Sequence, residues 1–230
     1  MASIEELFAA LPRQSWAGGP PPLIVMAGLP ASGKSFTAHL LAAHLGLTHV
    51  SADQVRMHIT GSKPRYSARE GARTSAEAAK LMRSLLKNNV GVVIDSVGLT
   101  RRARSRYLRA AQGKTVIIWC EVDEAIAAEL FEIRATAPGP WDFSRADAAE
   151  RARIMRVVNL EAPHSGEADL VVRLTSRQAD ALLAQLCREF DVQLCAVHLA
   201  PAEELLEHDL PLVNAIMEVP AEASLEQRKI

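Results

Sequence analysis

A run of eight residues, GLPASGKS from Gly28 to Ser35, has the residue types and spacing needed to hold a polyphosphate. Glycines in such a loop allow tight turns and a close approach of the backbone to phosphate oxygens. A helix that begins near Lys34 would add its N-terminal amides and the positive end of its dipole. The run therefore predicts a phosphate-binding loop for a nucleoside triphosphate, in which the lysine reaches the β- and γ-phosphates. The residues predicted to contact the nucleotide are Gly28, Leu29, Pro30, Ala31, Ser32, Gly33, Lys34, Ser35 and Phe36.

A carboxylate and an arginine follow this loop at helical spacing, in the stretch from Ser51 to Arg56. Asp53 should lie just beyond a short strand, where a carboxylate can take the proton of a substrate hydroxyl that attacks the γ-phosphate. Arg56 lies one helical turn later on the same face, and it could hold a substrate phosphate or another anion. The alternative is structural, with Asp53 capping a helix and Arg56 as its surface partner. We predict that Asp53 and Arg56 are catalytic and bind the substrate.

A third motif is an apolar strand that ends in an acid, at Asp95. An aspartate in this position can hold Mg²⁺, directly or through water, or orient an arginine. The next residue is Ser96, whereas many NTP hydrolases have a glutamate there to activate water, so the motif favours transfer to a hydroxyl. The alternative is an ordinary aspartate at a strand end. We predict that Ser35 and Asp95 ligate Mg²⁺ and that Asp95 also faces the substrate.

Two arginine-rich segments are further candidates. The first begins at Arg101, just after the Asp95 strand, and could recognise a phosphorylated substrate or simply be a solvated charged face. Its arginines are Arg101, Arg102, Arg104, Arg106 and Arg109. The second begins at Arg134, before an irregular stretch, where a lid cation could stabilise charge on the transferring phosphoryl group. Rival lid cations are Arg145, Arg151, Arg153 and Arg156.

Alternating strands and helices must position these side chains. Short apolar runs predict strands over 23–27, 48–51, 90–94, 115–120 and 170–174, with 192–199 as a candidate sixth. Spacing and capping residues predict helices over 3–11, 34–45, 53–60, 67–88, 101–111, 124–134, 145–160 and 177–190. This alternation is typical of an α/β fold with a central parallel sheet and right-handed crossovers. Ligands of such sheets bind outside the carboxyl ends of the strands.

Composition excludes several classes of protein. The chain has 230 residues, 49 % of them hydrophobic and only 4 % aromatic, which suits an aliphatic core. Its net charge of −1 argues against binding of long nucleic acid through phosphates, although a short nucleic-acid end or a small phosphorylated substrate stays open. No stretch approaches the about 20 apolar residues of a membrane span, and the N-terminal residues do not form a signal peptide. We therefore expect a cytoplasmic protein without membrane contact.

Cysteines and histidines give no sign of a metal centre. The three cysteines have no CxxC spacing and are expected to be small buried hydrophobes in a reducing compartment; they are Cys120, Cys187 and Cys195. The histidines lack ligand spacing and are expected to be exposed or hydrogen-bonded; they are His39, His44, His49, His58, His164, His198 and His208.

The order of the motifs resembles the small P-loop kinases, especially the polynucleotide-kinase-like branch and its relatives described as AAA-type ATPases or predicted kinases. Adenylylsulfate kinases, zeta toxins and chloramphenicol phosphotransferase are similar but more distant. The matching positions are the phosphate-binding loop, the S-x-D-x-x-R element at Ser51, Asp53 and Arg56, the strand-end Asp95 and an arginine-bearing helix. A lid with Arg134 and the later stretch 144–147 completes the match, which covers about residues 22–175.

The resemblance implies a P-loop NTPase fold with a helical lid, ATP and Mg²⁺ as cofactors, Lys34 and Arg134 as catalytic cations and Asp53 as general base. Two departures stand out: Leu130 occupies the place of the first lid arginine, and the strand end reads Asp95-Ser-Val-Gly. The second lacks the polar residues of polynucleotide kinases and weakens the case for a nucleic-acid 5′-hydroxyl as acceptor.

The sequence thus predicts an ATP-dependent kinase that acts on a hydroxyl of a small molecule or of a polynucleotide 5′ end. Two alternatives are a P-loop ATPase and a nucleotide-binding switch module without an acceptor. The predicted organisation is an N-terminal helix and linker over 1–21, a kinase domain over 22–175 with a lid at about 134–160, and a C-terminal extension over 176–230. The expected state is a monomer or a homodimer.

Overall fold

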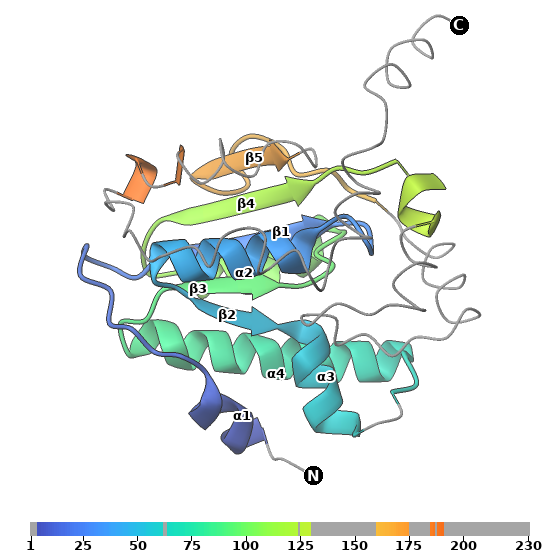
Figure 1. Cartoon of the computed structure of the whole chain (residues 1–230), viewed down its shortest axis with the longest axis horizontal. Coiled ribbons are helices and arrows are strands. Elements are labelled where there is room, and N and C mark those ends of the chain that lie inside the picture. The colour runs from blue at the N-terminus through green and yellow to red at the C-terminus, as the bar shows by residue number, and fades with distance from the viewer. Residues whose placement is uncertain are drawn as a thin grey trace, which may run out of the picture.

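Five parallel strands form the central sheet in the order β2-β3-β1-β4-β5 (Figure 1). The computed structural model of the chain describes residues 4–61, 64–123, 125–129, 160–174, 185–186 and 188–190. The strands are β1 (Leu23–Gly28), β2 (Thr48–Ser51), β3 (Val92–Asp95), β4 (Thr115–Cys120) and β5 (Leu170–Leu174). The predicted parallel sheet is confirmed in number and direction of its strands.

Helices alternate with these strands, as predicted. They are α1 (Ile4–Ala10), α2 (Lys34–Leu45), α3 (Ala52–Thr60), α4 (Ala68–Lys87) and α5 (Arg101–Leu108), followed by a short helical stretch over 125–129. α2 ends at Gly46, which adopts the left-handed backbone (φ 66°) that favours glycine at a helix end. Asp123 caps the stretch over 125–129, because its carboxylate accepts a hydrogen bond from the Ala125 amide.

Several predicted bounds differ from the structure by one residue, and two differ by more. β3 begins at Val92 instead of Val90, because Val90 pairs with Ser15 in an isolated antiparallel bridge outside the parallel sheet. α5 ends at Leu108 instead of Ala111. The amides of Ala110 and Ala111 bond three positions back, to the backbone oxygens of Tyr107 and Leu108. This tighter turn ends the α-helical geometry.

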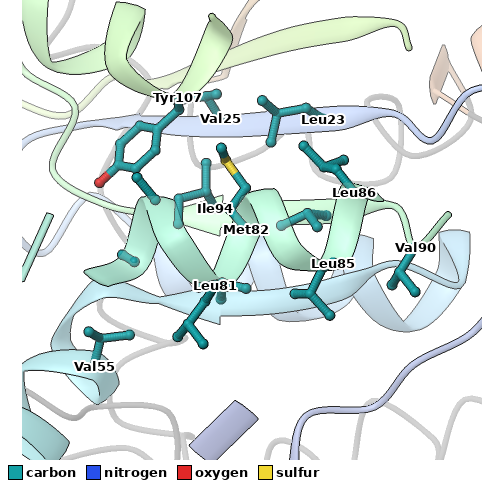
Figure 2. Packing of buried hydrophobic residues seen from close by; sticks show 14 of the residues in the cluster. Leu23, Val25, Val55, Leu81, Met82, Leu85, Leu86, Val90, Ile94 and Tyr107 are labelled. Atoms are coloured by element: carbon teal, nitrogen blue, oxygen red, sulfur yellow. The ribbon is translucent and has the colours of Figure 1, made fainter. Parts of the chain in front are cut away.

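Alternation along the strands separates two hydrophobic cores. On one face Leu23 and Val25 of β1 pack with Met82, Leu85 and other residues of α4 (Figure 2). On the other face, neighbouring strand residues such as Ile24 pack with α2, which overlies β1 in Figure 1. Because side chains alternate across a strand, both faces of β1 are buried, as expected for a central parallel strand.

The register brings the ends of three strands to one edge of the sheet. Asp95 of β3 pairs with Met26 of β1 on one side and with Ser51 of β2 on the other. The loop after β1 and the start of α3 therefore flank Asp95, at the carboxyl edge where ligands of such sheets bind.

Part of the predicted architecture lies outside the described residues. This applies to the lid with Arg134 and its rival cations, to Leu130, to the candidate strand over 192–199 and to nearly all of the C-terminal extension. Within the described part of the chain, no helix is long and apolar enough to cross a membrane.

Candidate active site

The loop between β1 and α2 owes its shape to backbone conformations that few residues can adopt. Gly28 has φ 139°, and a Cβ there would lie 2.4 Å from the backbone oxygen of Cys120. Gly33 has φ 82° and Ala31 has φ 63°, both in the left-handed region. Gly28 must therefore be glycine, because it packs against the end of β4.

Burial raises the pKa of the Cys120 thiol to about 12, so this cysteine is a buried apolar group, as predicted.

The start of α2 differs from the starts of the next three helices. A hydroxyl caps each of these, because Ser51, Ser67 and Thr100 accept hydrogen bonds from backbone amides of α3, α4 and α5. The residue in the capping position of α2 is Gly33, which provides no side-chain cap. Since the first amides of a helix have no partner within the helix, those of α2 can receive an anion, as the motif predicts.

Lys34 is folded back into the loop that precedes it. Its ammonium donates hydrogen bonds to the backbone oxygen of Leu29 and to the Ser32 hydroxyl, at 3.2 Å in the second case. The side chain is buried although it is charged. A cation held against the loop is well placed to meet the oxygens of a bound polyphosphate. Phe36, by contrast, is 38 % exposed.

Asp95 lies buried between the phosphate-binding loop and β2. Burial would raise the pKa of its carboxyl, but the His49 imidazole, the Lys34 ammonium and the Ser35 hydroxyl together lower that pKa below its usual value. Asp95 is therefore an ionised carboxylate next to a hydroxyl. Hard oxygen ligands of this kind suit Mg²⁺, so the pair Ser35 and Asp95 fits the predicted metal.

His49 is a site residue that sequence reasoning missed. Its Nε2 lies 3.5 Å from Oδ2 of Asp95, and its side chain is 15 % exposed. His39, one helical turn after Ser35 on α2, has a pKa lowered by burial and by the nearby His49. The signal in the sequence was the place of His49 two residues before Ser51, which gives both side chains the same face of β2. That signal has meaning only once β2 is known to pair with β3.

A second group of charged residues surrounds Asp53, at the start of α3. Arg56 Nη1 donates to Asp53 Oδ1 at 2.6 Å, and Arg56 Nε lies 3.2 Å from Glu70 Oε1. The guanidinium also lies over the Tyr66 ring, 4.5 Å from its centroid. We call Asp53, Arg56, Tyr66 and Glu70 the acceptor-side cluster. Ser51 caps α3, so the alternative role of Asp53 as the helix cap is wrong, whereas its pairing with Arg56 is confirmed.

Glu70 fixes the far side of this cluster. Its carboxylate accepts hydrogen bonds from the backbone amides of Arg65 and Tyr66 at 2.8 and 3.3 Å, so the residue at the start of α4 also holds the loop before that helix. The Asp53 side chain is 42 % exposed, compared with 10 % for Glu70. Asp53 is thus more open to a ligand than Arg56 and Glu70, its ion-pair neighbours in the cluster.

The arginines of α5 separate into two groups. Arg101 and Arg102 are exposed, whereas Arg104 is completely buried and pairs with Glu167 through two nitrogens, at 2.6 and 2.9 Å. Arg104 Nη1 also donates to the backbone oxygens of Gly98 and Glu161. Both interpretations of the basic helix are therefore wrong for Arg104, because it ties α5 to the segment before β5 and faces neither substrate nor solvent.

The start of α5 has a further anionic partner. The backbone amide of Arg101 donates to Oε2 of Glu161 at 2.8 Å. This carboxylate occupies the end of α5 at which the sequence predicted recognition of a phosphorylated substrate. Among the described residues, no group of three or more acidic, histidine or cysteine side chains could hold a metal ion.

Comparisons with known proteins agree with this geometry. A family model described as an AAA domain matches residues 23–163. A candidate kinase from Chloroflexus aurantiacus J-10-fl has a similar structure (TM-score 0.59, 17 % identity, 75 % of this chain and 97 % of that chain). An unliganded sugar kinase from Janibacter sp. HTCC2649 is also similar (TM-score 0.55, 19 % identity, 80 % and 98 % of the two chains).

A third similar structure contains ligands. It is the APS kinase CysC of Mycobacterium tuberculosis in complex with AMPPNP and APS (TM-score 0.52, 18 % identity, 75 % of this chain and 98 % of that chain). The comparison with curated proteins finds no match. At these identities the structural likeness establishes the fold, which is the P-loop NTPase fold.

Proposed function

The chain belongs to the family described as the AAA domain, and from this premise we propose that it is an ATP-dependent phosphotransferase that moves the γ-phosphate of ATP to a hydroxyl group. One observation carries the proposal. The loop with Lys34 folded into it, the ionised Asp95 beside Ser35, and the exposed carboxylate of Asp53 all belong to the carboxyl edge of the same three strands. A phosphate donor and a general base at one edge are the two parts that hydroxyl phosphorylation needs.

On the nucleotide side, the backbone of 28–35 and the Lys34 ammonium would bind the polyphosphate. Ser35 and Asp95 would hold Mg²⁺, which when bound neutralises charge on the phosphate oxygens. Lys34 would move from Leu29 and Ser32 to those oxygens, exchanging neutral acceptors for charged ones. Charge-assisted hydrogen bonds are about twice as strong as neutral ones, so this exchange favours nucleotide binding.

On the acceptor side, the proposal gives Asp53 the role of general base. Its carboxylate would take the proton of the acceptor hydroxyl as the oxygen forms a bond to the γ-phosphorus. The bond between that phosphorus and the oxygen bridging to the β-phosphate then breaks, and ADP leaves. Arg56 would hold Asp53 through Oδ1 and so orient the carboxylate for the substrate.

The contacts of Arg56 bear on the class of acceptor. The sequence allowed Arg56 to bind a substrate phosphate, but its guanidinium already contacts the carboxylates of Asp53 and Glu70 and the Tyr66 ring. An anionic group would meet two carboxylates beside one arginine. We therefore favour an acceptor with an uncharged hydroxyl-bearing portion at Asp53, a small molecule over a nucleic-acid end, in keeping with the net charge of −1.

The proposal places catalysis in residues 22–175 and keeps Arg134 as the predicted lid cation, outside the described residues. It also keeps ATP over GTP on the basis of the family resemblance, because no contact to a base can be assigned from the motifs.

The test follows labelled γ-phosphate from ATP with Mg²⁺, in desalted protein given either a metabolite extract or 5′-hydroxyl oligonucleotides. Wild type is compared with Asp53→Asn and with Asp169→Asn. The control changes an exposed carboxylate at the opposite edge of the sheet, where Asp169 bonds to Thr115. General bases typically contribute about 10²–10⁴-fold, so Asp53→Asn should lose label transfer by that factor and keep ATP affinity.

The possible outcomes separate the alternatives. Transfer in wild type and in Asp169→Asn, with loss in Asp53→Asn, supports the proposal and reveals the acceptor by its mobility. Label released only as free phosphate, equally in all three proteins, would contradict the general-base assignment and favour a P-loop ATPase. ATP binding without any turnover would favour a switch module.

A further inference from the structure

His49 lies outside the recognised motifs, and its side chain faces that of the predicted metal ligand Asp95. It lies on β2, which pairs directly with β3, and its Nε2 is buried 3.5 Å from Asp95 Oδ2. This distance is longer than an ordinary hydrogen bond of 2.7–3.2 Å, so a shift of a few tenths of an ångström would complete the bond. Contacts of this kind in sites without ligand are often long and tighten when the ligand binds.

The imidazole also has a neighbour on α2. Burial and the nearby His49 lower the pKa of His39, which is partly buried. His39 and Ser35 share a face of α2, since they are four residues apart. The His49 side chain therefore lies on the face of the sheet that α2 covers. Asp95 is its acidic neighbour.

We propose that His49 is the residue that positions Asp95 for Mg²⁺: by holding Oδ2 from the β2 side, it leaves the other carboxylate oxygen turned toward Ser35 and the metal. The inference rests on the Mg²⁺·ATP binding of the proposed function, and it adds a residue that the phosphate-binding motifs do not contain. Groups that orient a metal ligand typically change metal affinity by about 10–100-fold when they are removed. A free carboxylate can rotate, and fixing one oxygen removes that freedom before the metal arrives.

The test measures binding instead of catalysis. ATP affinity is determined by calorimetry, once with Mg²⁺ and once with EDTA, for wild type and three variants. His49→Phe keeps a ring of similar size but has no N–H donor, His49→Gln keeps a donor, and His44→Phe is the control. His44 is a partly buried histidine in the last turn of α2, at the end of the helix away from the phosphate-binding loop.

His49→Phe should weaken ATP binding by about tenfold or more when Mg²⁺ is present and leave it unchanged in EDTA. His49→Gln should recover most of the affinity, and His44→Phe should behave as wild type. Equal affinity of His49→Phe and wild type in Mg²⁺ would overturn the proposal. An equal loss with and without Mg²⁺ would also overturn it, because a general distortion of the loop does not depend on the metal.

Failure of this inference and failure of the proposed function are distinguishable. If wild type binds no ATP under either condition, the nucleotide assignment itself is wrong, and the role of His49 falls with it. If ATP binds with the expected Mg²⁺ dependence but no acceptor is phosphorylated, His49 keeps its role and only the kinase assignment fails. Thermal melts of all variants identify any that do not fold. If His49→Phe is one of them, His49→Leu, which also lacks an N–H donor, takes its place in the same comparison with the same expected and contradicting results.

Discussion

The phosphate-binding loop and the acceptor-side cluster lie at the same edge of the sheet but are built in different ways. The loop is one continuous segment, shaped by backbone dihedrals at Gly28, Ala31 and Gly33. The cluster draws its members from α3, from α4 and from the connection between them, and it is held by ion pairs and a cation–π contact.

This difference decides what each region tolerates. A site built from the backbone depends on individual glycines. A residue with a Cβ cannot replace such a glycine where the Cβ would clash with a carbonyl oxygen or the φ angle is unfavourable. A site built from side-chain pairs depends on mutual contacts, whose strength falls with exposure to water. The four predictions below test this contrast, beginning with a side-chain pair that is fully buried.

The largest effect is expected for Arg104→Met. Arg104 and Glu167 are 0 % and 3 % exposed, so removing the arginine leaves a buried carboxylate without its partner. Breaking such a pair costs about 3–5 kcal/mol, which urea denaturation would measure. Arg102→Met, an exposed arginine of the same helix, is the control and should change stability little. A loss below about 1 kcal/mol in Arg104→Met would show that burial does not govern the strength of these pairs.

Gly28→Ala should damage the phosphate-binding loop next most severely. Its Cβ would lie 2.4 Å from the Cys120 oxygen at φ 139°, and backbone strain of this kind costs about 1–3 kcal/mol. We expect a lower free energy of unfolding and at least about tenfold weaker ATP binding, since losing one charge-assisted hydrogen bond costs about 1.5–3 kcal/mol.

Gly71→Ala is the matched control for that change. Gly71 lies within α4, its Cβ would meet no atom within 4 Å, and its backbone φ is not positive. Alanine should therefore be neutral or stabilise the helix by up to about 1 kcal/mol. Equal effects of the two substitutions would refute the claim that the loop requires glycine for its backbone.

Glu70→Gln should have a smaller effect on catalysis. The amide removes the charged contact with Arg56 at 3.2 Å and keeps only one of the two oxygens that accept from the Arg65 and Tyr66 amides, a loss of about 1 kcal/mol. We expect kcat for phosphate transfer to fall by about fivefold with unchanged ATP affinity. Glu77→Gln, which removes the charge of the partly exposed partner of Lys80, should leave kcat unaltered. A shift in ATP affinity instead of kcat would assign Glu70 to the nucleotide side.

The smallest effect concerns Cys120, behind the phosphate-binding loop. With its pKa raised to about 12, only about one thiol in 10⁴ is ionised at pH 8, and the thiolate is the reactive form. Native protein treated with a thiol reagent at pH 8 should therefore show no modification at Cys120 by peptide mass spectrometry, whereas denatured protein should. Rapid labelling in the native state would mean that the end of β4 opens.

Prediction from sequence succeeded where a feature is local. The bounds of α2 follow from the Gly33-Lys34 start and the Gly46 stop, and those of β1, β2, β4 and β5 follow from short apolar runs. It failed at β3 and α5, whose ends depend on a bridge to Ser15 and on a tightened turn. Ser51 was expected to matter for its place in a motif, and it proved to be the cap of α3.

The sequence by itself determined the phosphate-binding loop, the α/β class and the acid at the end of β3, because each depends on dihedral preferences or on spacing within one segment. Tertiary structure alone decided which charges from different elements meet. It buried Arg104 against Glu167, sixty-three residues away, engaged Arg56 with Glu70, and brought His49 to Asp95. The physical reason is that an ion pair forms between surfaces that packing brings together, and spacing along the chain carries no information about that packing.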